Sequence, residues 1–348
     1  MIKYYTRVCN LFYPSNLKSK KKKKLLQLNG NSNFFFDKIE LITRKSKKII
    51  NIDEINLKKN IIKKKIKKDL KKIIRKKSFK GLNLNKTPLI MGVINLTPDS
   101  FSDGGKFNSY KKALDLAKQF KKYNCDILDL GAESTRPGSR EVKKINEWNR
   151  LKFPLKKISK LNKFISIDTR KSFIMNKALK YKINLINDIS GLSYDNLTLK
   201  FLKKTKIPFV IHHIKGNPSN MQKKPKYKNV VLDIYDYFEK KLKQVRSAGI
   251  KHNNIILDPG IGFGKNLKHN IEIFKKISIF HTLGFPILVG NSRKRFIKEI
   301  STLNDSNYRY GGTIASSLYL MTQGIQIIRV HDVNEVKQAI KVYKKLKF

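Results

Sequence analysis

Short apolar runs alternate with longer stretches of helical periodicity along residues 87–348. Eight runs rich in Ile, Leu and Val have the length and composition of buried parallel strands. They are Leu89–Ile94, Asp126–Leu130, Phe164–Ile167, Ile183–Ile186, Pro208–Ile211, Asn254–Leu257, Pro286–Val289 and Gln326–Val330. Because parallel strands need crossover connections, we expect a helix after each of them.

Apolar residues recur at helical spacing in the stretches between these runs. The expected helices are Tyr110–Tyr123, Lys144–Lys160, Ser172–Lys180, Leu197–Thr205, Val230–Ala248, Asn270–His281, Thr313–Gln323 and Asn334–Lys345. Eight strand–helix alternations in about 260 residues predict the α/β class and a (β/α)8 TIM barrel. A doubly wound open sheet is the alternative.

Polar residues stand at the end of every expected strand. In strand order they are Asn95; Glu133, Thr135 and Arg136; Asp168; Asn187 and Asp188; His212 and His213; Asp258; Asn291, Ser292, Arg293 and Lys294; and Arg329, His331 and Asp332. In a barrel these carboxyl-terminal ends all face one mouth, which is where barrel enzymes have their active sites. A requirement for core packing or solubility does not explain polar groups at all eight ends.

The chemistry of this set indicates a particular class of substrate. The carboxylates of Asp168 and Asp258, with neighbouring amides, can accept paired hydrogen bonds from the edge of a flat heterocycle. Arg136, Lys294, Arg329 and a protonated His331 would suit a phosphate or diphosphate. Together these groups indicate a heterocyclic substrate with an anionic leaving group.

Several sharper motifs fail when their spacing is tested. The segment 260–265, GIGFGK, resembles a phosphate-binding loop, but the spacing is wrong and Asn266 replaces the required Ser or Thr. His212 and His213 are adjacent, so on a strand they point to opposite faces and cannot serve one metal. No cysteine cluster and no GxSxG elbow is present. A covalent nucleophile is therefore not indicated.

Residues 1–86 form a Lys-rich N-terminal extension without a recognisable catalytic motif. Isoleucines and leucines recur among lysines from Leu57 to Lys77, which indicates a basic amphipathic helix. We interpret it as a solvated helix packed weakly on the main domain; a helix for a membrane surface or an acidic partner is the alternative. Phe34–Phe36 and Ile39–Ile42 are a candidate strand pair. A transit peptide is conceivable, although lysine rather than arginine dominates.

The composition gives the chain a strong positive charge but does not by itself indicate a binding partner. The chain has 77 Lys and Arg against 25 Asp and Glu, a formal net charge of +52. Lys, Asn and Ile are abundant throughout, so we attribute the charge to composition and do not expect a nucleic-acid partner. Cys9 and Cys125 suggest no disulfide framework and fit a reducing, cytoplasmic location. No apolar run is long enough for a membrane span.

The motifs of residues 88–348 resemble those of the dihydropteroate synthase family. They are MGVINLTPDSFSDGG (91–105), GAESTRPGS (131–139), SIDTRKS (166–172), INDISG (186–191), HIKGNPSNMQ (213–222), LDPGIGFGKN (257–266), VGNSRK (289–294) and IIRVHD (327–332). The resemblance does not cover residues 1–86. It implies a transferase, commonly homodimeric and a sulfonamide target. With Mg²⁺, such an enzyme joins (7,8-dihydropterin-6-yl)methyl diphosphate to 4-aminobenzoate and releases diphosphate, a step of folate synthesis.

The resemblance also assigns site residues. Asp168, Asn187, Asp258 and Lys294 resemble the pterin-binding set, and Asn95 resembles the Mg²⁺ ligand. Thr135, Arg136, Arg329 and His331 resemble the groups that contact diphosphate, while Arg136, Phe263 and Ser292 lie near the 4-aminobenzoate position. Among them, Arg136, Lys294, Arg329 and His331 are the expected catalytic groups. Loops 95–105 and 133–140 resemble the family's two mobile loops, and no general base is assigned.

Two departures and two rival functions remain at this stage. Tyr308 stands where the family commonly has an acidic residue, and Asn291 replaces a smaller or apolar one near the 4-aminobenzoate end. One rival is a pterin-binding methyltransferase with a corrinoid partner, which needs no cations for a diphosphate. The other is a basic RNA-binding protein. Both rivals predict that no diphosphate is released.

Overall fold

The barrel is built from eight parallel strands. This computed structural model describes residues 2–13, 24–97, 105–302 and 304–347. The strands are β5 (Leu89–Asn95), β6 (Ile127–Gly131), β7 (Phe164–Asp168), β8 (Leu185–Asp188), β9 (Phe209–His212), β10 (Ile255–Asp258), β11 (Leu288–Gly290) and β12 (Ile327–Val330). They are ordered β10-β9-β8-β7-β6-β5-β12-β11, and a parallel bridge between Leu257 and Ile287 brings the two ends together. The predicted (β/α)8 barrel is therefore confirmed, and the open sheet is excluded.

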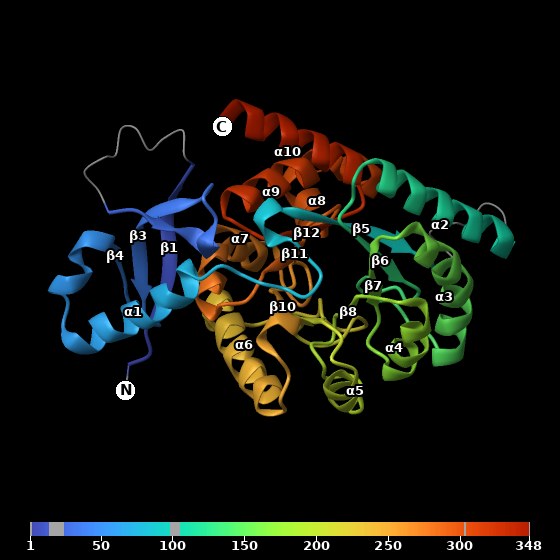
Figure 1. Cartoon of the computed structure of the whole chain (residues 1–348), viewed down its shortest axis with the longest axis horizontal. Coiled ribbons are helices and arrows are strands. Elements are labelled where there is room, and N and C mark those ends of the chain that lie inside the picture. Colours follow the sequence, from blue (N-terminus) through green and yellow to red (C-terminus); the bar gives the residue numbers. More distant parts are fainter. Residues whose placement is uncertain (1, 14–23, 98–104, 303, 348) are drawn as a thin grey trace.

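Helices surround the strands (Figure 1). They are α2 (Gly105–Lys122), α3 (Lys144–Ile158), α4 (Ser172–Ala178), α5 (Thr198–Thr205), α6 (Val230–Ser247), α7 (Leu267–Lys275), α8 (Arg295–Ser301), α9 (Tyr310–Thr322) and α10 (Val333–Lys347). Where one helix was expected after β11, both α8 and α9 follow. The expected helix at 270–281 is divided into α7 and a 3-10 segment, η10 (Ile277–Leu283).

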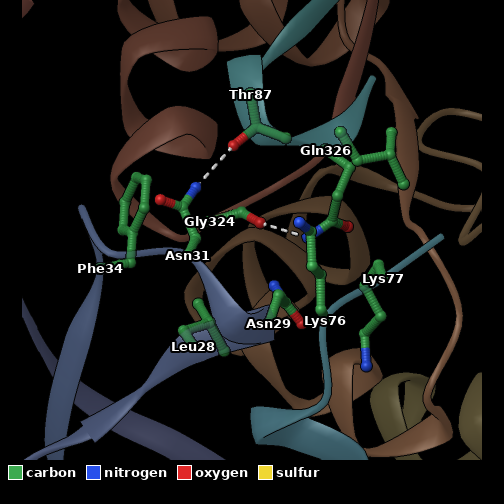
Figure 2. A pocket seen from close by; sticks show the side chains of 10 residues that line it. Leu28, Asn29, Asn31, Phe34, Lys76, Lys77, Thr87, Gly324 and Gln326 are labelled. Carbon is green, nitrogen blue, oxygen red and sulfur yellow. Dashed lines mark hydrogen bonds between the residues drawn. The ribbon is translucent and has the colours of Figure 1, made fainter. Parts of the chain in front are cut away.

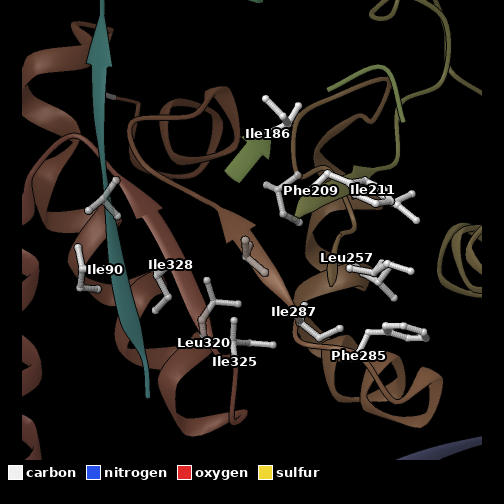
Figure 3. Packing of buried hydrophobic residues seen from close by; sticks show 14 of the residues in the cluster. Ile90, Ile186, Phe209, Ile211, Leu257, Phe285, Ile287, Leu320, Ile325 and Ile328 are labelled. Carbon is white, nitrogen blue, oxygen red and sulfur yellow. The ribbon is translucent and has the colours of Figure 1, made fainter. Parts of the chain in front are cut away.

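Strand residues alternate between two hydrophobic layers. Leu89 and Met91 point into the barrel, whereas Ile90 between them packs outward against the helices. Figure 3 shows part of the outer layer, where Ile90 and Ile328 lie near Leu320 of α9. Because the strands are covered on both faces, their sequences are continuous apolar runs.

Several strands end later than the sequence indicated. Asn95, Asp168, Asp188, His212 and Asp258 are the last residues of their strands rather than the first residues after them. Their backbones still pair with neighbouring strands; Asp258, for example, is paired with His212. The polar side chains are consequently held on the rigid sheet.

The N-terminal segment forms a folded module, in contrast to the weakly packed helix that was expected. It contains β1 (Tyr5–Phe12), β2 (Leu26–Gln27), η3 (Leu28–Gly30), β3 (Phe35–Ile42), β4 (Lys47–Asn51), η4 (Ile52–Leu57) and α1 (Asn60–Ile74). The antiparallel sheet has the order β1-β3-β2, with β4 also paired to β3. The strand pair expected within 34–42 is one continuous strand, and Ile66 and Ile73 of α1 are fully buried against the sheet.

This N-terminal module is attached to the side of the barrel through the edge strand β1. Ser278 and Thr282 of η10 donate hydrogen bonds to the carbonyls of Val8 at 2.8 Å and Thr6 at 2.6 Å. Arg44 forms ion pairs of 2.8 and 2.6 Å with Asp233 and Asp236 of α6. The barrel thus satisfies carbonyl groups of an edge strand that would otherwise remain open for pairing.

A short segment links the module to the barrel and covers the end opposite the mouth. Phe79, and Leu84 of η5 (Leu84–Lys86), pack with the inward-facing residues of the strands. In packing terms, residues 79–84 therefore belong with the barrel although they precede residue 87. Among the described residues, no helix is long and apolar enough to cross a membrane.

A small cavity, lined by both polar and apolar residues, marks the junction between module and barrel (Figure 2). Asn31 donates to Thr87 at 3.2 Å across this junction. Lys77 lies in the cavity wall with only 6% of its surface exposed, and its Nζ donates to the Lys72 carbonyl at 2.5 Å. Burial, together with the charges of Arg75 and Lys72, lowers the pKa of the Lys77 ammonium to about 7.

Replacement of Lys77 by Met is expected to raise the melting temperature at pH 7, because folding no longer buries an ammonium. The pKa of Lys77 is lower in the folded than in the unfolded state. The unfolded wild-type chain therefore binds more protons between pH 7 and about 10.5, and wild-type stability rises across that window. The variant's advantage, on the order of 1–3 kcal/mol at pH 7, should shrink towards pH 10. Thermal unfolding measures it, with exposed Lys71→Met as the control; a lower melting temperature at pH 7 would contradict the expectation.

Candidate active site

The mouth of the barrel brings together most of the side chains that the sequence singled out. Asp168 and Asp258 end β7 and β10, Asn187 is the penultimate residue of β8, and Arg329 extends from β12. Lys294 follows β11 as the residue before α8. Four strands thus supply four of these groups and the start of α8 supplies Lys294, so each stands on or directly beside a regular element.

Arg329 is the centre of a buried charge cluster. Its Nε lies 2.6 Å from Asp129 and its Nη2 lies 2.7 Å from Asp168. Burial alone would lower the pKa of Arg329, but the two carboxylates outweigh it and raise that pKa. Asn187 also donates to Asp129, at 3.2 Å. Asp129 therefore fixes two mouth residues from below.

Asp129 was not among the predicted site residues because it lies inside an apolar strand, two residues before its end. Its side chain has no exposed surface, and its Oδ1 has no hydrogen-bond partner. A buried carboxylate inside a strand requires a cationic partner, and that requirement was the signal available in the sequence. The partner, Arg329, is 200 residues away along the chain.

The two predicted pterin-binding carboxylates have raised pKa values. Burial raises the pKa of Asp168 to about 7, although Arg329 opposes the shift. Burial also raises the pKa of Asp258 to about 6, against a 2.7 Å hydrogen bond from the Gly260 amide and the charge of Lys294. Near neutral pH, both groups can therefore exchange protons in response to a bound ligand.

Lys294 and Phe263 form one side of the mouth. The Lys294 Nζ lies 4.3 Å from the Phe263 ring centroid and donates to the Ile261 carbonyl at 2.5 Å. Burial lowers the pKa of Lys294 to about 8, and Asp258 opposes this shift. The His212 and Phe263 rings pack edge to face, with the centroids 4.5 Å apart.

The segment 260–265, GIGFGK, has a structural role that centres on Lys265. Its amine is buried, 2.8 Å from the Phe263 carbonyl and 3.0 Å from Nδ1 of His213. At Gly260, φ is +69° and an added Cβ would lie 2.0 Å from the His213 carbonyl, so only glycine fits. Lys265 and these glycines shape a tight loop that carries Phe263. The prediction that His212 and His213 diverge is confirmed, because His213 packs on Tyr237 instead.

His331 and Ser292 form a hydrogen-bonded pair beside this cluster. Ser292 Oγ lies 3.0 Å from Nδ1 of His331 and accepts a bond from the His331 amide at 3.1 Å. Ser292 Oγ also lies 3.5 Å from Oδ2 of Asp332, so its hydroxyl has two acceptors within reach. If it donates to Nδ1, the neutral His331 ring carries its single N–H proton on Nε2. Burial and the charge of Arg329 lower the pKa of His331 to about 3. Without a bound anion His331 is neutral, so the cationic role expected of it requires a ligand.

The loop with Thr135 and Arg136 is held at its start by Glu133. Glu133 accepts from Arg170 at 3.0 Å and from Lys171 at 2.8 Å. Arg136 itself is exposed, and within the described parts of the chain neither Thr135 nor Arg136 makes a side-chain hydrogen bond to another mouth residue. Arg136 nevertheless lies near the mouth, since its charge helps to lower the pKa of His331.

One expected position lies differently from its prediction. Asn291 is fully buried and donates to Thr313, Ser316 and Ser317 of α9, so it faces the helix layer rather than the 4-aminobenzoate end. Asn95 is partly exposed at the end of β5. Most of the first expected mobile loop, residues 98–104, lies outside the described residues.

Comparisons with known proteins give a consistent result. A family model for pterin binding enzymes matches residues 91–331. The dihydropteroate synthase of Escherichia coli K12 is 39% identical over 256 residues, which cover 73% of this chain and 90% of that protein. The dihydropteroate synthase of Bacillus subtilis is 36% identical over 263 residues, covering 75% and 90%.

Solved structures agree with the sequence relatives. Yersinia pestis dihydropteroate synthase, solved with a sulfonamide drug, has a TM-score of 0.72 and 36% identity, and the match covers 77% of this chain and 98% of that chain. The Thermus thermophilus enzyme in complex with 4-aminobenzoate has a TM-score of 0.68 and 35% identity, covering 76% and 96%.

Proposed function

The chain belongs to the pterin-binding enzyme family and is a transferase with dihydropteroate synthase activity, and from this premise we propose which residues at the mouth of the barrel bind each substrate and the leaving diphosphate. The enzyme joins (7,8-dihydropterin-6-yl)methyl diphosphate to 4-aminobenzoate in tetrahydrofolate synthesis. The C–O bond to diphosphate breaks, a C–N bond forms, and the amine loses a proton. The observation that supports this assignment is that buried carboxylates and cations lie together at the mouth of the barrel.

The pterin is assigned to Asp258, Asp168, Asn187 and Lys294. An ionised Asp258 would accept the amino and ring N–H groups of the pterin edge as two parallel hydrogen bonds. Lys294 would donate to the ring carbonyl from the opposite side. Asn187 Oδ1 is buried without a hydrogen-bond partner, which supports a ligand-directed role for this amide.

The leaving diphosphate is assigned to Arg329, His331, Arg136 and Thr135. Charge develops on the leaving oxygen as the C–O bond breaks, so preorganised cations and N–H donors lower the barrier. Neutral His331 would donate from Nε2, and a bound diphosphate would raise the low pKa of its ring. The pterin ring can tolerate a cationic methylene, so an SN1-like path needs no strong base to activate the amine.

The 4-aminobenzoate is assigned to the face formed by Phe263, Ser292 and Arg136. Phe263 offers apolar contact for the benzoate ring, and Lys265 fixes the carbonyl of this residue. Arg136 would pair with the carboxylate once its loop closes. We further propose that sulfonamides compete for this position, since the Yersinia pestis enzyme was solved with such a drug.

Mg²⁺ is assigned to Asn95 together with diphosphate oxygens. An amide oxygen is a hard donor that suits Mg²⁺, and this ion commonly combines few protein ligands with phosphate oxygens and water. Within the described residues no cluster of three or more His, Cys, Asp or Glu side chains is arranged for a metal. When bound, the ion would neutralise charge on the leaving diphosphate.

Asn95→Leu is expected to lower kcat/KM by about 10²-fold, because it removes the proposed hard donor. The apparent Mg²⁺ requirement should rise at the same time. Titration of Mg²⁺ against diphosphate release, and calorimetry of Mg²⁺–diphosphate binding, would test both effects. An unchanged Mg²⁺ dependence would exclude Asn95 as the ligand.

The activity itself is tested by diphosphate release from the full-length protein. Release should require the pterin diphosphate and 4-aminobenzoate together, with Mg²⁺ present. Release without 4-aminobenzoate would indicate hydrolysis, and a folded protein that binds pterin without turnover would favour the methyltransferase alternative.

A cytoplasmic location is proposed from the free thiols of Cys9 and Cys125, which suit a reducing compartment.

A homodimer is proposed through the surface of α8 and α9. Ile300 and Tyr310 are 59% and 51% exposed there. Such a patch favours burial against a second copy. Light scattering after size exclusion should give twice the chain mass, and Ile300→Asp with Tyr310→Glu should give the single mass. A monomeric wild-type protein at micromolar concentration would contradict the proposal.

A further inference from the structure

A groove of about 940 Å³ lies on the outer wall of the barrel, where α3, α4 and α5 meet. Its lining comes from residues 141–146, 171–176, 194–197 and 200–204. None of the residues that we assign to pterin, diphosphate, 4-aminobenzoate or Mg²⁺ lines it. The reaction therefore leaves this groove unexplained.

Exposed ammonium groups line the groove. Lys143, Lys144, Lys200 and Lys204 are exposed, and within the described parts of the chain none of them forms an ion pair with a carboxylate. The four positive charges come from two separate elements, the start of α3 and α5. An occupant of the groove would therefore meet positive charge from both sides.

The two carboxylates of the groove are already used within the protein. Asp195 accepts from the amides of Ser172 at 2.8 Å and Leu197 at 2.9 Å. Burial alone would raise the pKa of Asp195, but these bonds outweigh it and lower that pKa. Glu141 accepts from the Tyr194 hydroxyl and lies 3.8 Å from Arg170. In the described part of the chain neither carboxylate forms an ion pair with these lysines, although the charge of Lys144 contributes to the lowered pKa of Asp195.

The floor of the groove is apolar and accessible. Ile145 is 52% exposed and Leu197 is 57% exposed, while Phe173 and Phe201 are only partly buried against the barrel core. Solvent contact with such side chains is unfavourable, and an apolar group of a ligand would displace that water. The groove thus combines an apolar floor with a cationic edge.

The aromatic rings favour one class of ligand over another. Lys144 and Lys177 lie 5.4 and 5.7 Å from the Phe173 centroid, and Arg170 lies 4.1 Å from that of Tyr194. Cations already occupy these ring faces, so they are less available for stacked bases, which single-stranded nucleic acids require. Aliphatic Ile145 and Leu197 instead suit the side chains of a peptide.

We propose that this α3–α5 groove binds an acidic peptide segment of a partner protein. A bulky aliphatic or aromatic side chain of the peptide packs on Ile145 and Leu197. Asp or Glu residues on both sides of it pair with the four lysines, which provides orientation as well as attraction. This binding surface is separate from the catalytic mouth and goes beyond the synthase activity.

The test is selection of short random-sequence peptides on the full-length protein, followed by fluorescence anisotropy of the enriched peptides. Enriched peptides should combine several acidic residues with a central bulky apolar one. Lys144→Glu with Lys200→Glu should weaken their binding by at least about tenfold. The matched control, Lys240→Glu with Lys243→Glu at two exposed positions of α6, makes the same charge change and should weaken binding by less than about threefold.

A second pair of variants separates specific docking from general attraction to a basic protein. Ile145→Ser with Leu197→Ser keeps every charge and should also weaken binding by at least about fivefold. Synthase turnover of all variants shows that they are folded. Equal losses in groove and control variants would overturn the proposal, as would unchanged binding in the serine variant. Tighter binding of single-stranded RNA than of any enriched peptide, lost with Lys144→Glu and Lys200→Glu, would overturn it in favour of a nucleic-acid site.

Discussion

Arg329→Met is expected to reduce kcat/KM for diphosphate release by about 10³-fold, the range seen when a preorganised transition-state donor is lost. The guanidinium is positioned by Asp129 and Asp168 at 2.6 and 2.7 Å, so it is already oriented before substrate arrives. Arg329→Lys should recover little activity, because a single ammonium cannot reproduce the two contacts together with a third to diphosphate.

The same substitution should also change stability in a pH-dependent manner. Without Arg329, Asp129 and Asp168 are buried without their cation, which costs about 3–5 kcal/mol when both stay ionised. Arg329 opposes the raised pKa of Asp168, so without it that folded pKa rises further above the unfolded value; the folded state then binds more protons and stability falls as pH increases. The variant should be closest to wild type near pH 5 and most destabilised near pH 8.

Steady-state kinetics and thermal unfolding from pH 5 to 8 measure both effects. Arg295→Met removes an exposed arginine whose partner is Glu299 on the same helix, so it should leave kcat/KM and the pH profile nearly unchanged. Retention of more than a tenth of wild-type kcat/KM by Arg329→Met, at a pH where the variant is folded, would contradict the assigned role.

The strand-end residues could be predicted because periodicity alone locates them. Asp168, Asn187 and Asp258 end apolar runs, and parallel connectivity brings such ends to one mouth regardless of loop detail. Asp129 could not be placed in this way. Whether a residue within a strand points into the barrel or towards the helices is known only when the strand register is known. Lys265 was missed because its partners, His213 and Phe263, meet only through the fold.

The N-terminal module was missed for a different reason. Strand β4 contains Lys47 and Lys48, and α1 contains long lysine runs, so solvated side chains obscure the apolar periodicity of these elements. The signals that remained were Ile66 and Ile73, seven residues apart on one face of α1. They belong to one hydrophobic cluster with residues of β1, β3 and β4, strands that the sequence did not pair. Long-range antiparallel pairing is set by tertiary packing rather than by local pattern.

Asp258→Asn is expected to weaken binding of the pterin substrate by about 10²–10³-fold, corresponding to two hydrogen bonds to a charged acceptor. The amide can still accept one bond, but its NH2 group faces a donor on the pterin edge. In the wild-type protein, affinity should fall below pH 6, because a carboxyl with a pKa of about 6 must lose its proton to accept both bonds. The variant should lack this acid limb.

The chain provides a matched control in Asp188, at the end of the neighbouring strand β8. It is also fully buried with a pKa raised by burial to about 6, but it accepts from Ser190 at 2.6 Å and from the Leu192 amide at 3.2 Å. Asp188→Asn should therefore lower stability and leave pterin affinity within about threefold of wild type. Calorimetric titration with the pterin substrate between pH 5 and 8 compares the two variants. If both weaken binding equally, buried negative charge rather than direct recognition explains the effect, and the assignment of Asp258 to the pterin edge is wrong.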